Sequence, residues 1–390
     1  MILLEDALKK TKENIRILGF EDVPVSDSPG RILGEDICSG IEMPPFNKSA
    51  MDGYAVSSSD NREKYEIVEI IAAGKFPEKE LKPGQCSKIM TGAPLPKGAD
   101  RVIKVEVTEE KGNFMFIKGE DKSFNVCFRG EDIKRGDLIL KKGTKIRPPE
   151  TGIIASVGIP VIKVFKRPVV SVIATGSEIV EPGNKLEPGN IYNSNGYSVS
   201  AQVKSTGSLL NFSGIIKDDF NTIKNSISSL LETSDIVVIS GGVSMGDYDF
   251  VPGIIKELGI TIYFNKVAIQ PGKPTLFGTG KGKVVFGLPG NPVSTFVIFE
   301  VFLRSFLYGM MGYEYSPVHM KGELKKDFKR KKTERDLFIP VLYEDGGLVD
   351  IVDYHGSAHL NSLGSANGLL KVPRGEKEIL KGTVVNVRQF

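Results

Sequence analysis

Residues 283–294 read KVVFGLPGNPVS, and this stretch decides the fold. An apolar run of strand length, Lys283–Phe286, stands directly before a turn rich in glycine and proline. Pro292 fits the first position of a following helix, because proline lacks the N–H group that this position leaves without a partner. The stretch therefore predicts a strand, a tight turn and a helix, in that order.

The same pattern occurs twice upstream. Pro168–Ala174 and Asp235–Ile239 are apolar runs that end in the turns TGSE (175–178) and SGGVSMGD (240–247). Continuous apolar strands that alternate with amphipathic helices are typical of a parallel sheet covered on both faces. We therefore predict a central α/β domain with a doubly wound parallel sheet. The expected helices are Asn195–Ser205, Phe220–Glu232, Val251–Leu258 and Pro292–Met310.

Three glycine turns are expected at one edge of this sheet, where ligands of such sheets bind. Glycine lets backbone N–H groups approach a ligand, and a helix N-terminus carries a partial positive charge, so the turns predict a cradle for phosphate or another oxyanion. A single glycine turn is more often a plain connection, but three together favour a ligand. The candidate binding residues are Thr175, Gly176, Ser240, Gly241, Gly242, Ser244, Gly290, Asn291, Pro292 and Ser294, with Pro271 and Gly272 from a further loop.

Carboxylates crowd the same predicted edge. Glu178, Asp247 and Asp249 follow the strands, and Asp218 and Asp219 lie on a preceding connection. An oxyanion is repelled by nearby carboxylates, and a divalent cation such as Mg²⁺ would reverse that repulsion. Glu178 and Asp249 are our candidate ligands for Mg²⁺. The alternative is that these acids cap helices or lie in solvent, which we expect for one of Asp218 and Asp219.

Lys266 and Lys273 add positive charge near the same edge, although each alone is more often a solvated lysine. Gly272-Lys273 is followed by Pro274, where a P-loop needs serine or threonine. No GxGxxG motif follows a predicted strand. The sequence therefore does not predict a standard ATPase or dehydrogenase.

The flanking regions have a different texture. Residues 48–130 and 316–390 contain short alternating runs separated by glycine, proline and charges, which is typical of small β domains. We predict four domains: an α/β N-terminal region formed by residues 1–47 with 131–165, an inserted small β domain (48–130), the central α/β domain (166–315) and a C-terminal β domain (316–390).

The composition argues against several classes of protein. The net charge of +3 is too small to indicate nucleic-acid binding, and we interpret the basic run 325–332 as a solvated strand or loop. Three separated cysteines without a CxxC pair do not favour a zinc site. The apolar stretch Phe296–Leu307 contains Glu300 and Arg304, so a buried helix is expected instead of a membrane span. With no signal-peptide pattern, we expect a cytoplasmic protein.

Seven ordered segments together resemble the MoeA family, molybdopterin molybdenumtransferase, which includes the C-terminal domain of gephyrin. The resemblance covers essentially the whole chain, and seven motifs in order are far more specific than any one. The segments are PFNKSAMDGYA (45–55), MTGAPLP (90–96), RGEDI (129–133), ATGSE (174–178), ISGGVS (239–244), PGKP (271–274) and GLPGNP (287–292).

The resemblance implies a reaction and an assembly. Members of the family take adenylylated molybdopterin and molybdate, with a divalent cation such as Mg²⁺, and release the molybdenum cofactor and AMP. They are homodimers of four-domain chains, with a cleft between the central molybdopterin-binding domain of one subunit and the small β domain of the other. The adenylyltransferase of the same pathway is a further implied partner; neither nucleic acid nor a membrane is.

The resemblance also implies site residues. Many members have a second lysine where this chain has Gln270, so we expect Lys273 to supply that charge. The phosphates of the pterin and of AMP would lie at the central turns, and Asp52 and Thr91 would close the cleft from the partner subunit. The implied acids fall on Asp52, Asp132, Glu178, Asp218 and Asp249, the threonine on Thr91 and the basic residue on Lys266.

Three other interpretations are open. An adenylyltransferase that activates molybdopterin with ATP resembles residues 166–312 alone, so the four-domain build and the segment 51–54 argue against it. A non-catalytic scaffold is disfavoured because we see no extra N-terminal domain or long linker. A tungstate-inserting relative cannot be separated by sequence, because tungstate and molybdate share their charge and nearly their size.

Overall fold

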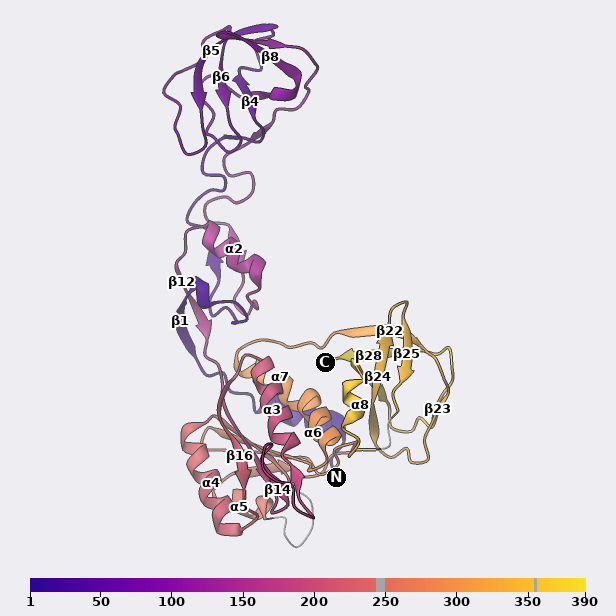
Figure 1. Cartoon of the computed structure of the whole chain (residues 1–390). Coiled ribbons are helices and arrows are strands. Elements are labelled where there is room, and N and C mark those ends of the chain that lie inside the picture. The colour runs from indigo at the N-terminus through magenta and orange to yellow at the C-terminus, as the bar shows by residue number, and fades with distance from the viewer. Residues whose placement is uncertain (243–249, 354–355) are drawn as a thin grey trace. The chain divides into compact units, whose positions relative to one another are not determined.

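The computed structural model describes residues 1–242, 250–353 and 356–390 (Figure 1). The chain divides into two compact units. The larger unit consists of Met1–Asp22, Gly30–Gly34 and Lys163–Phe390, and the smaller unit consists of Val23–Pro29 and Glu35–Ile162. The four-domain division proposed above is finer than these two units and stays a prediction.

The larger unit is built around a six-stranded sheet. Its order is β16 (Leu209–Ile216), β13 (Val169–Thr175), β17 (Ile236–Ser240), β21 (Lys283–Leu288), β20 (Leu276–Gly280) and β18 (Thr261–Phe264). The first four strands are parallel, which confirms the predicted core of the sheet. β20 is antiparallel to both of its neighbours, which the prediction missed. Its hairpin with β21 turns at Lys281 and Gly282, whose φ angles of 52° and 78° fit a two-residue turn of the primed type.

Helices cover both faces of this sheet, as predicted. Ile236 and Val238 of β17 pack in one core with α3 (Ser194–Ser205) and α6 (Pro292–Ile298). Val237 and Ile239 pack in a second core with α4 (Phe220–Thr233) and α5 (Val251–Glu257). Successive strand residues point to opposite faces, so one continuous apolar run supplies both cores.

One long helix runs through the first core. It comprises α6, a π-helical segment η3 (Phe299–Leu303) and α7 (Arg304–Met310). It is apolar and long enough to cross a membrane, but 78% of its most apolar window is buried in the fold, so it is a core helix. Glu300 in η3 is fully buried. Its carboxylate accepts hydrogen bonds from Arg304 (2.6 and 2.7 Å) and from Gln202 of α3 (2.8 Å).

The C-terminal part of the larger unit is a closed β barrel. Its strands follow the order β24 (Asp336–Glu344), β25 (Leu348–Ile351), β22 (His319–Leu324), β28 (Val384–Gln389) and β26 (Gly368–Val372), and β26 pairs with β24 again. β19 (Ile269–Gln270) adds to β24. Arg388 of β28 donates a hydrogen bond to the Glu300 carbonyl oxygen, which joins the barrel to the long helix.

The smaller unit contains a second six-stranded sheet. Its order is β7 (Arg101–Lys104), β4 (Gly53–Val56), β6 (Gln85–Ile89), β5 (Lys64–Ile71), β9 (Phe114–Ile117) and β8 (Thr108–Lys111). A Cβ atom at Gly53 would lie 2.1 Å from the Ile103 carbonyl oxygen, so glycine is needed where β4 and β7 meet.

The remaining α-helices and strands of the two units are α1 (Leu4–Glu13), α2 (Pro148–Ser156), α8 (Asn361–Gly364), β1 (Phe20–Pro24), β2 (Ile37–Cys38), β3 (Lys48–Ser49), β10 (Val126–Cys127), β11 (Leu138–Leu140), β12 (Val161–Phe165), β14 (Ile179–Val180), β15 (Ile191–Tyr192), β23 (Phe328–Lys329) and β27 (Glu378–Ile379).

Candidate functional site

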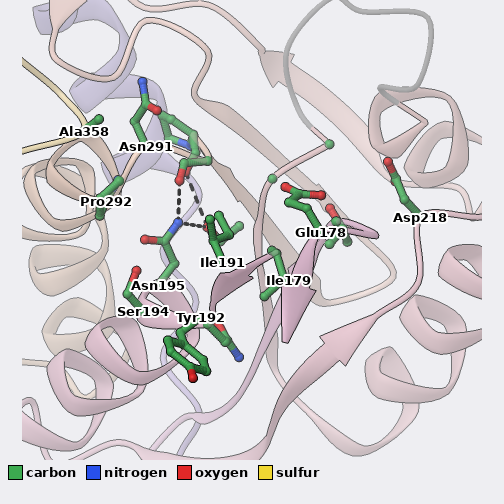
Figure 2. Close-up of a pocket in the computed structure, with 18 of the residues that line it drawn as sticks. Glu178, Ile179, Ile191, Tyr192, Ser194, Asn195, Asp218, Asn291, Pro292 and Ala358 are labelled. Carbon is green, nitrogen blue, oxygen red and sulfur yellow. Dashed lines mark hydrogen bonds between the residues drawn. The ribbon is translucent and has the colours of Figure 1, made fainter. Parts of the chain in front are cut away.

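A cavity of about 630 Å³ lies at the carboxyl ends of β13, β17 and β21. The three turns that follow these strands form one part of its wall, and β15 with the start of α3 forms another (Figure 2). The lining residues are Thr175, Gly176, Glu178, Ile179, Ile191, Tyr192, Asn193, Ser194, Asn195, Asp218, Ser240, Gly241, Gly242, Pro274, Pro289, Gly290, Asn291, Pro292 and Ala358.

The first two turns press against each other. Gly241 has a φ of 95°, and a Cβ atom there would lie 2.5 Å from the Thr175 carbonyl oxygen. Gly242 has a φ of 63°, and its Cβ would lie 3.0 Å from Thr175 Oγ1. Both glycines are therefore required by backbone conformation and by close approach. Thr175 is only 4% exposed, and its Oγ1 has no hydrogen-bond partner among the described residues.

The third turn is shaped differently. A Cβ atom at Gly290 would meet no atom within 4 Å, so packing inside the chain does not require glycine there. Asn291 donates from Nδ2 to Ser357 Oγ (2.8 Å), and the Val293 N–H donates to the Ser357 carbonyl oxygen (3.0 Å). Since Pro292 has no N–H, the start of α6 offers fewer free donors to an anion than the turn pattern suggested.

Asn195 joins two of the turns, and the sequence reasoning missed it. Its Nδ2 donates to Ser240 Oγ (2.9 Å) and to the Gly290 carbonyl oxygen (2.7 Å), as Figure 2 shows. α3 begins at Ser194, one residue before its predicted start, and Asn193 caps it by accepting the Gly196 N–H. A cluster of asparagine and serine before a helix marks a cap, and that was the available signal.

Among the residues that the structure describes, two carboxylates line the cavity, and a third that we considered does not. Glu178 and Asp218 are both in the wall. Asp219 instead caps α4, because it accepts the Thr222 N–H at 2.8 Å. This backbone hydrogen bond, followed by that from the Thr222 hydroxyl, lowers the pKa of Asp219. The helix-cap alternative therefore applies to Asp219 and leaves Asp218 in the cavity.

Three candidates, Asp249, Asp247 and Ser244, are outside the described residues. Several of the described candidates lie outside the cavity wall. Ser294 and Pro271 are buried and do not line the cavity, and Gly272 packs on α6, since its Cβ would lie 2.4 Å from Ile298 Cδ1. Lys266 lines a separate hollow beside the N-terminus, whereas Lys273 is exposed next to Pro274, which does line the cavity.

Three candidates belong to the smaller unit. Asp52 precedes β4 and Thr91 follows β6, and the pairing of Gly53 with Ile89 brings them together. Thr91 donates its backbone N–H (2.6 Å) and its hydroxyl (2.7 Å) to Asp52 Oδ1. These two hydrogen bonds, the backbone one first, lower the pKa of Asp52. Asp132 is exposed in the same unit, with its N–H bound to the Met43 carbonyl oxygen (3.1 Å).

Three family models match the chain in order. They describe the MoeA N-terminal region (domain I and II) over residues 2–158, a probable molybdopterin binding domain over residues 171–309 and the MoeA C-terminal region (domain IV) over residues 321–390. Every residue that lines the cavity, except Ala358, falls within the second match.

Relatives that are similar over nearly the whole chain indicate the same family. A molybdopterin molybdenumtransferase of Bacillus subtilis (strain 168) is 36% identical over 383 residues, which are 94% of this chain and 89% of the relative. One from Staphylococcus epidermidis (strain ATCC 35984) is 33% identical over 398 residues, 99% and 95% of the two chains. The crystal structure of a molybdopterin biosynthesis MoeA protein from Pyrococcus horikoshii OT3 is similar at a TM-score of 0.86, with 30% identity and full coverage of both chains. The chain therefore belongs to the MoeA family, a family of enzymes.

Proposed function

We propose that the chain is a molybdopterin molybdenumtransferase, which inserts molybdenum from molybdate into adenylylated molybdopterin and releases AMP. The observation that carries this proposal is the cavity at the ends of β13, β17 and β21, which lies within the match to a probable molybdopterin binding domain. The relatives named molybdopterin molybdenumtransferase, similar over nearly the whole chain, support the reaction type.

The cavity has the parts that such a substrate needs. We place the phosphates against Gly241 and Gly242, which line the cavity, and near the Thr175 hydroxyl, which has no hydrogen-bond partner among the described residues. Gly290 leaves open space beside them. Apolar surface of the pterin or adenine ring would lie against Ile191, which is 57% exposed in the same wall.

The reaction has two parts, one at the phosphoanhydride and one at the molybdenum. At the phosphoanhydride, a water oxygen bonds to phosphorus while the bridging P–O bond breaks, which releases AMP, and the proton of the water passes to solvent. At the molybdenum of molybdate, two molybdenum–sulfur bonds form, and the two dithiolene S–H protons leave with one oxo group as water. Polar groups fixed in the wall, such as the Thr175 hydroxyl, would stabilise the charge that develops on the phosphate oxygens.

The donors in the wall fit a magnesium ion. Glu178 and Asp218 supply hard oxygen ligands, and Mg²⁺ commonly joins one or two carboxylates to substrate phosphates. No group of three histidine, cysteine, aspartate or glutamate side chains that could hold a metal occurs in the described parts of the chain. Phosphate oxygens would therefore complete the site, with Asp249 as a further proposed ligand. Bound there, the ion would offset repulsion between these carboxylates and the phosphates.

We also propose a cytoplasmic homodimer in which Asp52 and Thr91 of the partner subunit complete the cleft. The dimer and its shared cleft follow from the family resemblance, and the location follows from the lack of a signal-peptide pattern. Mixing two variants tests it: Glu178→Ala and Asp52→Ala should each be inactive, and mixed dimers should regain activity because one of their two clefts is intact. A mixture that stays inactive after subunit exchange contradicts the shared cleft.

The direct test of the proposed function is cofactor synthesis in vitro without oxygen. Adenylylated molybdopterin and molybdate are incubated with the protein, with and without Mg²⁺, and AMP release is followed. We expect turnover only with the metal. Glu178→Ala and Asp249→Ala should each reduce turnover strongly and leave the unfolding midpoint close to that of the wild type. Wild-type turnover in both variants would remove these residues from the mechanism.

The same assay separates the alternatives. Incubation with ATP and molybdopterin should not yield the adenylylated form; if it does, the chain is an adenylyltransferase. Competition between molybdate and tungstate decides which oxyanion is inserted. Absence of turnover with either oxyanion contradicts the proposed function altogether.

A further inference from the structure

We propose that Asn195 is a positioning residue that holds the second and third turns of the cavity at the spacing the substrate phosphates require. This inference rests on the proposed function and assigns a residue that the sequence reasoning did not select. Asn195 belongs to α3, whereas the turns that it joins follow β17 and β21. One side chain therefore links three elements of the wall (Figure 2).

The orientation of the Asn195 amide is determined by its neighbours. The Gly290 carbonyl oxygen can only accept a hydrogen bond, so the atom 2.7 Å from it must be the amide nitrogen. Ser240 Oγ lies 2.9 Å from the same nitrogen and 3.4 Å from the Pro289 carbonyl oxygen. The serine hydroxyl accordingly accepts from Asn195 and donates to Pro289. Both N–H groups of one amide are thus used to hold the two turns together.

The Ser240 hydroxyl also reaches the third turn at the Pro289 carbonyl oxygen, but at 3.4 Å that contact is longer than either hydrogen bond of Asn195. The Gly241 N–H does bond to the Leu288 carbonyl oxygen (3.2 Å), but that bond belongs to the end of the sheet. Gly290 has no side chain and nothing lies within 4 Å of its Cβ position, so side-chain packing at Gly290 does not hold this turn in place. Without Asn195, we expect the third turn to move relative to Gly241 and Gly242.

The variants separate positioning from general packing. Asn195→Ala removes both hydrogen bonds, and Asn195→Asp keeps the shape but turns an acceptor oxygen toward the Gly290 carbonyl oxygen, so it repels where the amide attracted. The matched control is Asn211→Ala. Asn211 of β16 also donates from Nδ2 to serine and threonine hydroxyls, those of Thr233 (3.0 Å) and Ser234 (3.2 Å), but it does not line the cavity.

The measurements are AMP affinity by calorimetry and the kinetics of cofactor synthesis. We expect Asn195→Ala to weaken AMP binding and raise the KM for adenylylated molybdopterin by about tenfold, the equivalent of two lost hydrogen bonds, with kcat within a few fold. Asn211→Ala should leave both unchanged. Because Asn195 acts through Ser240, the loss in the double variant Asn195→Ala/Ser240→Ala should be smaller than the sum of the single losses.

Each outcome decides the inference. If Asn195→Ala does not fold, Asn195→Asp carries the same test. An unchanged KM and AMP affinity in a folded variant, with an active wild type, overturns the positioning role alone. Fully additive losses with Ser240→Ala also overturn it. A wild type that neither turns over nor binds AMP overturns both this inference and the proposed function.

Discussion

Two polar regions of the larger unit share the same helices and differ in how they use them. In the cavity, α3 supplies Asn195 and the long helix supplies Pro292. In the second region, Gln202 of α3 donates to the buried Glu300 of the long helix. Both oxygens of the Glu300 carboxylate accept hydrogen bonds inside the fold. At the cavity, Thr175 Oγ1 is buried without a partner in the described parts of the chain, and Gly290 faces open space. Buried polar groups normally find partners within the protein. Gln202 Oε1 beside Glu300 also has no partner among the described residues, but of the two atoms only Thr175 Oγ1 belongs to a residue that lines the cavity, where a ligand could supply the hydrogen bond.

The largest effect should come from breaking the Glu300 cluster. Glu300→Ala leaves the charge of Arg304 buried without its partner, since the Arg304 side chain is only 13% exposed. We expect the free energy of unfolding to fall by about 3–5 kcal/mol in urea denaturation. The control is Lys224→Ala at the surface pair with Glu257 (2.7 Å), where the loss should stay below about 1 kcal/mol. Equal losses in the two variants contradict the structural role of the cluster.

A smaller loss is expected from crowding the cavity turns. Gly241→Ala strains a residue with φ of 95° and places Cβ against the Thr175 backbone, so the free energy of unfolding should fall by about 1–3 kcal/mol. Gly253→Ala is the control with the opposite sign. Gly253 is in α5 with open space around it, and alanine there should stabilise the protein by about 0.5–1 kcal/mol. If Gly241→Ala also stabilises, the close packing of the two turns is wrong.

Replacing the unpaired hydroxyl sharpens the comparison. Thr175→Val keeps the shape, and because the hydroxyl has no partner in the described structure, the unfolding free energy should change by no more than about 0.5 kcal/mol. AMP affinity should fall about tenfold. Thr295→Val should lower the unfolding free energy and leave AMP affinity nearly unchanged, because the Thr295 hydroxyl donates to the Pro289 carbonyl oxygen (2.5 Å) inside the fold. A stability loss of more than about 1 kcal/mol in Thr175→Val would mean that the hydroxyl has a structural partner.

The smallest effect concerns pH. The hydrogen bonds from Thr222 lower the pKa of Asp219 in the folded state, so its contribution to stability is present above the ordinary pKa of 3.8 and is lost as the pH falls through the lower folded value. Asp219→Asn keeps a capping side chain but cannot titrate. The wild type should lose slightly more stability than this variant between pH 5 and about pH 3. Identical thermal midpoints across that range would contradict the assignment.

Sequence alone predicted the core of the sheet because its signal is local. Each apolar run, such as 283–286, needs only its own residues to indicate a strand buried on two faces. It missed Asn195, whose partners Ser240 and Gly290 are 45 and 95 residues away. The sequence also could not decide which of Asp218 and Asp219 caps a helix and which lines the cavity. That depends on the residue at which α4 begins. The missed antiparallel β20 depends on the conformation of one two-residue turn.

The closure of the C-terminal barrel has a consequence for solubility. β28 lies between β22 and β26, so both of its edges are occupied. Removing Val384–Gln389 would turn the closed cylinder into an open ribbon and expose the backbone hydrogen-bonding groups of two strands at once. Unpaired strand edges recruit other chains, so a trimmed protein should precipitate at concentrations where the intact one stays dispersed.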